Sequence, residues 1–146
     1  MTTVYLGLGS NIGNRKNYLN KAIKQLYRNS IQIEKISRII ETAAVDGPPQ
    51  SRFLNIALRA TTKLSPHQLL QLIKKIETDL GRRPTVRNGP RVIDIDILLY
   101  DNLKIKNHDL IIPHAKMLER DFVMRPLSEI APAIVRKLIY AHYYKY

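Results

Sequence analysis

The order of strand-like and helix-like segments is the feature that most narrows the possible folds of this chain. Four segments read as strands, 3–9, 31–40, 53–62 and 89–102, and two have apolar residues at helical spacing, 14–29 and 66–80. The resulting order, βαββαβ, predicts an α+β fold with a ferredoxin-like antiparallel sheet and two helices on one of its faces. The rest of the chain holds short apolar pieces, where we expect additional short C-terminal helices that pack against the core.

The second predicted helix has clear boundaries. Ser65 can cap its N-terminus, Pro66 suits the first helical position, and Gln68 completes a Ser-x-x-Gln capping box. Gly81 can end this helix. Near the N-terminus, the stretch GLGSNIGNR has neither the glycine spacing of a dinucleotide fingerprint nor the Gly-Lys-Ser/Thr of a phosphate loop. We therefore interpret it as a tight turn between a strand and a helix.

Length and composition limit the number of domains, the location and the partners that we expect. The 146 residues suffice for one hydrophobic core, so we expect a single domain over 1–146. There is no cysteine, no apolar run near the roughly 18 residues of a membrane helix, and no secretory signal, so we expect a cytoplasmic protein without a membrane partner. The formal charge of +12 favours polyanionic partners, either nucleic acid, an anionic membrane or phosphorylated small molecules. The alternative is that a basic composition is general among the proteins of the source organism.

Asp94 and Asp96 alternate with isoleucines in the strand-like stretch VIDIDIL. Residues two apart on a strand project to the same face, with Cα atoms about 6.5–7 Å apart, so the two carboxylates repel each other unless something neutralises them. A solvated outer face is one interpretation. However, aspartate is disfavoured in strands, and four arginines precede the pair: Arg82, Arg83, Arg87 and Arg91. Because Mg²⁺ prefers carboxylate oxygens and substrate phosphates, the sequence indicates a magnesium site for phosphoryl transfer.

Two further groups of residues have the chemistry of a binding pocket. Phe53 and Asn55 share one face of the third predicted strand, where a ring can stack on a flat ligand and an amide can bond its edge. His114, Arg120 and Phe122 follow a proline within a short window and can complete a pocket for a nucleotide and a ring. A core aromatic with a satisfied asparagine, and a structural histidine, are the alternatives, and the residues alone leave them open.

Five motifs occur in one order: GLGSNIGNR near the start, RFLN at 52–55, IETDLGR at 76–82, GPRVIDIDIL at 89–98, and IPH…M…R.FV…PL.EIAP at 112–132. Together they resemble the 6-hydroxymethyl-7,8-dihydropterin pyrophosphokinase family over roughly residues 3–135. The resemblance implies a ferredoxin-like fold with extra helices. It also implies transfer of the β,γ-pyrophosphate of ATP to the hydroxymethyl oxygen of the pterin, with release of AMP, in folate biosynthesis.

The resemblance implies roles for individual residues, matched position by position. Asp94 and Asp96 match the ligands of two Mg²⁺ ions, and Arg82 and Arg91 match arginines that clamp the phosphates. The other positions that match the ATP site are Glu77, His114 and Arg120. The positions that match the pterin site are Thr42, Ala43, Val45, Phe53, Asn55 and Phe122. The implied partners are the small molecules ATP, as co-substrate, and the pterin, with no nucleic acid, and we expect a monomer.

The chain departs from the family pattern at three places. Asn88 stands where many relatives have an aromatic residue, usually Trp, and Ala115 follows His114 where Tyr is common. We therefore expect that closure of the arginine-rich loop and the affinity for ATP can differ here. The tail VRKLIYAHYYKY does not resemble the usual family ending.

Three other functions are also compatible with the sequence. The charge of +12 is compatible with a ferredoxin-like module that binds nucleic acid, although the first strand offers only Tyr5 for stacking on a base. The Asp-x-Asp pair is also compatible with a metal-dependent nucleotidyl- or glycosyltransferase. The altered loop is compatible with an inactive homologue of the pyrophosphokinases.

Overall fold

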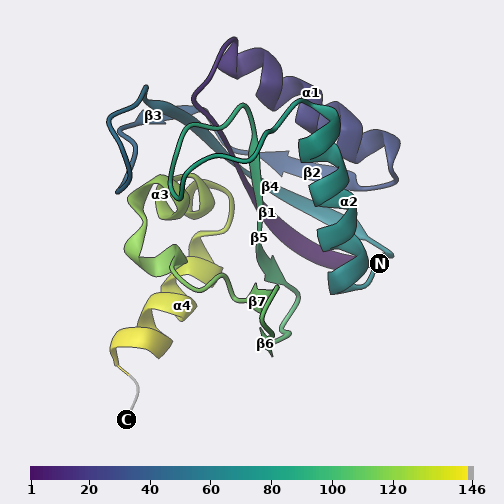
Figure 1. The fold of residues 1–146 in the computed structure, drawn as a ribbon. Coiled ribbons are helices and arrows are strands. Elements are labelled where there is room, and N and C mark those ends of the chain that lie inside the picture. Colours follow the sequence, from purple (N-terminus) through teal and green to yellow (C-terminus); the bar gives the residue numbers. More distant parts are fainter. Residues whose placement is uncertain (145–146) are drawn as a thin grey trace.

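The computed structural model describes residues 1–144 and consists of a sheet with helices on both faces (Figure 1). Its elements are β1 (Thr2–Ser10), α1 (Arg15–Arg28), β2 (Gln32–Ile36), β3 (Ile40–Thr42), β4 (Phe53–Thr62), α2 (Pro66–Asp79), β5 (Asp94–Tyr100), β6 (Ile105–Lys106), β7 (Ile111–Ile112), a 3₁₀ helix (Met117–Glu119), α3 (Asp121–Ile130) and α4 (Pro132–Tyr143). Lys145 and Tyr146, the end of the basic aromatic tail, lie outside the described residues.

The main sheet has the strand order β2–β4–β1–β5, and β3 also pairs with β4. All of these pairs are antiparallel. Helices α1 and α2 lie on one face of the sheet, and α3 and α4 lie on the other side (Figure 1). The predicted ferredoxin-like α+β fold with additional C-terminal helices is confirmed. No helix within residues 1–144 is long and apolar enough to cross a membrane.

Alternation along the central strands divides the apolar residues between two cores. One core packs under α1 and α2, and its strand residues include Val4, Leu6, Leu8, Ile56, Leu58, Ile95 and Ile97. The other core packs under α3 and α4, and its strand residues are Tyr5, Ala57, Leu98 and Leu99. Because both faces of the central strands are partly buried, the sheet does not have one apolar and one fully solvated face.

Segment 31–40 does not form the single strand predicted from its alternation. It is broken into β2 and β3, and Ser37 lies in the break. The Ser37 N–H donates to the Ala57 carbonyl (2.9 Å), and Ser37 Oγ accepts from the Ala57 N–H (2.8 Å). One extra residue is accommodated there, since Ile36 pairs with Leu58 and Ile40 pairs with Asn55. A buried serine that bonds both main-chain groups of one residue thus replaces a regular ladder pair.

Gly7 and Gly9 of GLGS lie in a strand, as the predicted strand 3–9 implied. Strand β1 continues through Gly7 and Gly9 to Ser10, and the turn comes afterwards, where Gly13 has a φ of +68°. The start of the second helix, α2, is as predicted. Ser65 and Gln68 form the reciprocal capping box, with N–O distances of 2.9 and 3.3 Å. The expected turn between β1 and α1 is also present, but it covers only the part of GLGSNIGNR after Ser10.

A bulge in β5 also escaped the prediction from alternation. Leu6 pairs with Ile97 and Tyr5 pairs with Leu99, so Leu98 is an extra residue in the ladder. Leu98 and Leu99 both contribute to the core under α3 and α4. Because of this bulge, the half of β5 near Tyr100 places apolar side chains in the core under α3 and α4. The half that carries Asp94 remains available for polar side chains.

We predict that Ser37→Ala destabilises the protein by about 1–3 kcal/mol, because it leaves the buried Ala57 N–H without an acceptor. Urea unfolding should show a lower midpoint with an unchanged slope. Ser51→Ala, at an exposed position in the loop before β4, is the matched control and should change stability by less than about 0.5 kcal/mol. Equal midpoints for the two variants would show that the Ser37 hydroxyl does not hold the break between β2 and β3.

Candidate active site

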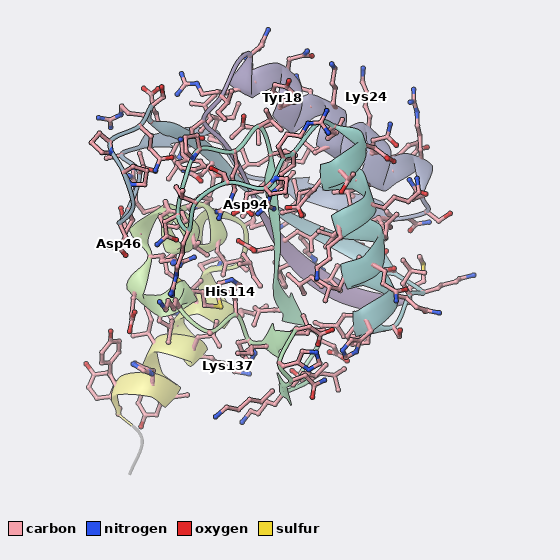
Figure 2. The ribbon with its side chains drawn as sticks, viewed as in Figure 1. Tyr18, Lys24, Asp46, Asp94, His114 and Lys137 are labelled. Atoms are coloured by element: carbon pink, nitrogen blue, oxygen red, sulfur yellow. The ribbon has the colours of Figure 1, made fainter. Side chains whose placement is uncertain are left out.

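Asp94 and Asp96 project from β5 onto the face of the sheet opposite to the α1–α2 core. The residues that pair with them on β1 are Gly9 and Gly7. No side chain from that neighbouring strand therefore covers the two carboxylates. Figure 2 shows Asp94 near the centre of the molecule and His114 below it in this view, whereas Lys24 and Lys137 lie on the outer helices α1 and α4.

Three cavities meet at the carboxylate pair. The aromatic cavity is lined by Val45, Phe53, Asn55, Arg120 and Phe122, among others. The cationic cavity includes Lys74, Glu77, Arg82, Arg83 and Arg91. The hairpin cavity, beside β6 and β7, includes Leu70, Ile97, His108, Leu110, Ile111 and His114. Asp96 lines all three cavities, and Asp94 lines the first two. The pair therefore stands between an aromatic compartment and a cation-lined one.

Asp96 is the most strongly perturbed acid of the site. Burial, followed by the charges of Asp94 and Glu77, raises the pKa of Asp96 to about 8. About a third of its side chain is exposed, and it opens into the cavities. His114 Nε2 lies 3.8 Å from its Oδ1, and burial together with Arg120 lowers the pKa of His114. Both shifts favour the uncharged forms, so this contact is not a strong ion pair at neutral pH.

Glu77 and Arg82 connect helix α2 to the metal-ligand candidates. Arg82 donates from Nη1 to Glu77 Oε2 and, at 3.1 Å, to Asp94 Oδ1. Glu77 Oε2 also accepts from the main-chain N–H of Ile95 (2.8 Å). Burial raises the pKa of Glu77, and the Ile95 hydrogen bond and the Arg82 charge oppose that rise. Arg82 is thus hydrogen-bonded to two carboxylates at once.

The donor set of this site suits magnesium. No cluster of three or more acidic, histidine or cysteine side chains that could hold a metal occurs within residues 1–144. Zinc and calcium sites in proteins ordinarily need more protein ligands than two carboxylates. Mg²⁺ takes one or two carboxylates and completes its octahedral shell with water and substrate phosphates. Asp94 and Asp96, next to a cavity lined by arginines, fit that description.

Two polar atoms beside the pair have no protein partner. Arg91 Nε and His114 Nδ1 are buried and make no hydrogen bond to any described residue. Buried donors and acceptors are rarely left unpaired, because desolvation costs about 1–3 kcal/mol for each group. Since Arg91 lines the cationic cavity and His114 lines the hairpin cavity, both atoms are available to a polar ligand or a water there.

The aromatic cavity has a fixed amide at its base. Asn55 is buried and donates from Nδ2 to Thr42 Oγ1 (2.8 Å), which sets the orientation of the amide. A Cβ atom added at Gly9 would lie 2.9 Å from Asn55 Oδ1 and 3.4 Å from the Phe53 ring. Gly9 therefore makes room for the two side chains that the sequence singled out for a flat ligand. Val45 and Phe122 line the same cavity, whereas Ala43 lines none of the three.

Asn11 and Gln50 are structural members of the site that the sequence analysis missed. The Asn11 side chain donates to Gln50 Oε1 (2.8 Å) and accepts from the Arg91 N–H (2.8 Å). Gln50 Nε2 donates to the Asn88 carbonyl (2.7 Å). These bonds join the turn after β1 to the loops before β4 and β5. The sequence did offer one signal, since Asn11 is a polar residue directly after an apolar strand. Its partners, however, are 39 and 80 residues away.

Comparison with known proteins places the chain in a family. The family described as 7,8-dihydro-6-hydroxymethylpterin-pyrophosphokinase matches residues 5–132. The 2-amino-4-hydroxy-6-hydroxymethyldihydropteridine pyrophosphokinase of Aquifex aeolicus is 46% identical over 94% of this chain and 86% of its own length. The protein of the same name from Bacillus subtilis is 43% identical over 91% of this chain and 80% of its own length.

Other relatives are longer. The mitochondrial folate synthesis bifunctional protein of Arabidopsis thaliana is 44% identical over 97% of this chain, which spans 26% of that protein. Among solved structures, wild-type HPPK-DHPS of Plasmodium falciparum superposes with a TM-score of 0.68 at 16% identity, over the whole of this chain and 45% of its own. At that identity the superposition supports the fold alone. The family match and the bacterial relatives go further: this chain belongs to the 7,8-dihydro-6-hydroxymethylpterin-pyrophosphokinase family.

Proposed function

We propose that this chain transfers the β,γ-pyrophosphate of ATP to the hydroxymethyl group of 6-hydroxymethyl-7,8-dihydropterin, giving the pterin diphosphate and AMP. The observation that carries the proposal is the position of Asp94 and Asp96 between the aromatic cavity and the cationic cavity. A flat acceptor in the first compartment and a triphosphate in the second would meet at the carboxylate pair. Such proximity converts the transfer between two substrates into a step within one complex.

The pterin would occupy the aromatic cavity. Phe53 and Phe122 supply rings, and Asn55 supplies an amide whose orientation is set by Thr42. An amide offers both a donor and an acceptor to the edge of a pterin ring, and the aromatic residues cover its faces. Main-chain groups near Thr42, Ala43 and Val45 would add further contacts to the same ring.

ATP would occupy the other two cavities. The hairpin cavity has apolar walls that suit a purine base, and the cationic cavity suits the triphosphate. Arg82 and Arg91 can hold phosphate oxygens with their planar guanidinium groups. Glu77 and His114 complete the proposed ATP site, and Arg120, which lines the adjoining aromatic cavity, would contact the phosphates from there. The unpaired Arg91 Nε and His114 Nδ1 would then find partners in the nucleotide.

Two Mg²⁺ ions bound to Asp94 and Asp96 would neutralise charge on the triphosphate and make the hydroxymethyl group easier to deprotonate. The acceptor oxygen then forms a bond to the β-phosphorus, the bond from that phosphorus to the α,β-bridging oxygen breaks, and the hydroxyl proton is released. Arg91 and Arg120, which both line the aromatic cavity, stabilise the charge that develops on the transferred group. The loop that carries Asn88 and Gly89 borders the same cavity and would limit access of competing water.

The surroundings of the carboxylate pair disfavour the rival hypothesis of a nucleic-acid-binding module. The sheet face that a nucleic-acid-binding module would use carries Asp94 and Asp96, and α3 packs on part of it. Carboxylates there would repel a phosphate backbone. The two cores share one sheet, which favours a single domain over residues 1–146. The lack of cysteine favours a cytoplasmic enzyme.

The first test mixes the protein with Mg-ATP and 6-hydroxymethyl-7,8-dihydropterin and measures AMP. We expect AMP to form only when both substrates are present, and Asp96→Ala to lower its rate at least about 100-fold while the fold is retained. Asp79→Ala, an exposed acid at the end of α2, is the control and should keep the parent rate. Turnover of Asp96→Ala within about tenfold of the parent would show that the assignment of the metal ligands is wrong.

The raised pKa of Asp96 makes a second prediction, for the metal-free protein. A carboxyl whose pKa is about 8 when folded and 3.8 when unfolded destabilises the fold progressively as pH rises between those values, because the unfolded chain releases its proton more readily. Asp96→Asn removes this effect. In EDTA its melting temperature should match that of the parent near pH 4 and exceed it by a few degrees near pH 8. Parallel melting profiles of the two proteins, like those expected for Asp79→Asn, would contradict the prediction.

Gly9→Ala tests the proposed pterin site. The added methyl would displace Asn55 and Phe53, so we expect the KM for the pterin to rise about tenfold, equivalent to about 1.4 kcal/mol, with little change in the KM for ATP. Thr3→Ala is the control, since Thr3 lies on the same strand but lines none of the three cavities. If Gly9→Ala raised the KM for ATP more than the KM for the pterin, the aromatic cavity would not be the pterin site.

A further inference from the structure

Arg82 is bound to a proposed metal ligand in the protein without metal. Its Nη1 donates to Asp94 Oδ1 at 3.1 Å, and the same nitrogen donates to Glu77 Oε2. The three side chains are 27%, 28% and 10% exposed, respectively, so the contacts are partly shielded from solvent. Charge-assisted hydrogen bonds in such surroundings are stronger than exposed ones and less sensitive to salt. Arg82 therefore competes directly with any cation that approaches Asp94.

Glu77 determines where Arg82 can go. Its Oε2 is held by the Ile95 N–H at 2.8 Å, in the middle of the strand segment that carries the aspartates. This anchor keeps the guanidinium beside Asp94, but the two partners are not equivalent. Glu77 is buried and lines only the cationic cavity, whereas Asp94 is more exposed and opens into both the aromatic and the cationic cavities. A cation arriving from a cavity can reach Asp94 and leave the contact between Arg82 and Glu77 in place.

We propose that Arg82 is an exchangeable internal counter-ion of the metal site: it neutralises Asp94 when no metal is bound and is displaced from it by the divalent cation. This proposal rests on the assignment of Asp94 as a metal ligand in the proposed function. A dication attracts a carboxylate more strongly than a monovalent guanidinium at the same distance. Displacement would leave the guanidinium tethered to Glu77 at the wall of the cationic cavity, free to bind a phosphate oxygen.

The exchange gives the site an order of events. Without metal, Arg82 is occupied by two carboxylates and has less capacity for the triphosphate. With metal, Asp94 is satisfied by the cation, and Arg82 becomes available in the same cavity. Metal binding and phosphate binding are then coupled through one side chain, and such coupling is reciprocal.

A different role for Arg82 would have the opposite effect on the metal. If Arg82 orients Asp94 from behind while the metal binds its other oxygen, loss of Arg82 would weaken or not change metal binding. If Arg82 is a competitor, its loss strengthens metal binding. The sign of the change in affinity therefore separates the two roles.

The experiment measures binding of Mn²⁺ alone, without nucleotide or pterin, by the electron paramagnetic resonance signal of the free ion. We compare the parent protein with Arg82→Ala and with Arg82→Gln, which keeps an amide donor without the charge. The matched control is Arg83→Ala, which removes an exposed cation from the same cavity that has no ion pair among the described residues. Circular dichroism and thermal melts check that each variant is folded, and Arg82→Gln takes the place of Arg82→Ala if the latter is not.

We expect the Arg82 variants to bind Mn²⁺ at least about fivefold more tightly than the parent, which is the lower end of common coupling effects. Arg83→Ala should change the affinity less than about twofold, because it alters only the general charge of the cavity. Unchanged or weaker binding by the Arg82 variants, an equal gain in Arg83→Ala, or no Mn²⁺ binding by either the parent or the variants would each overturn the proposal. Since no turnover is measured, this outcome is independent of the AMP assay that tests the proposed function.

Discussion

The carboxylate of Glu77 links the scaffold of this protein to its site. It lies near the end of α2, accepts a hydrogen bond from the main chain of β5 at Ile95, and holds Arg82 beside Asp94. A buried acid is costly unless its oxygens are bonded, and here one oxygen has both a main-chain and a charged donor. One carboxylate therefore fixes the helix, the strand and the arginine relative to each other. The two candidate metal ligands, Asp94 and Asp96, flank the Ile95 residue that bonds this carboxylate.

The sheet supports this arrangement by dividing β5 into two halves with different surroundings. At the end near Tyr100, the bulge at Leu98 places apolar side chains under α3 and α4. At the other end, Asp94 and Asp96 lie opposite Gly9 and Gly7, where the missing side chains leave open space. Gly9 also brings β1 close to Asn55 and Phe53 without crowding them. A site with room for two ligands is thus formed on a sheet whose other face is filled.

The charges of the site and of the molecule have different consequences. Locally, burial and the charges of Asp94 and Glu77 raise the pKa of Asp96, so its ionisation is costly when no metal is bound. Such local cost is common where a site awaits a ligand. Over the whole molecule, the charge of +12 favours the approach of polyanions such as nucleotides. The cations Lys21 and Lys24 of α1 lie on the opposite side of the sheet from the aspartates, so they can contribute to long-range attraction and not to contacts with the proposed substrates.

The sequence alone determined the features that depend on local periodicity and capping. Alternation placed Ile95 and Ile97 in the core and the two aspartates on the other face, and the capping box at Ser65 fixed the start of α2. The order of the segments was enough for the fold class, and the motifs were enough for the family. Only the tertiary structure decided the break at Ser37, the bulge at Leu98 and the contacts of Asn11, Gln50 and Arg82. Each of these depends on a partner distant in sequence, and a pattern read along one chain contains no information on which distant groups meet.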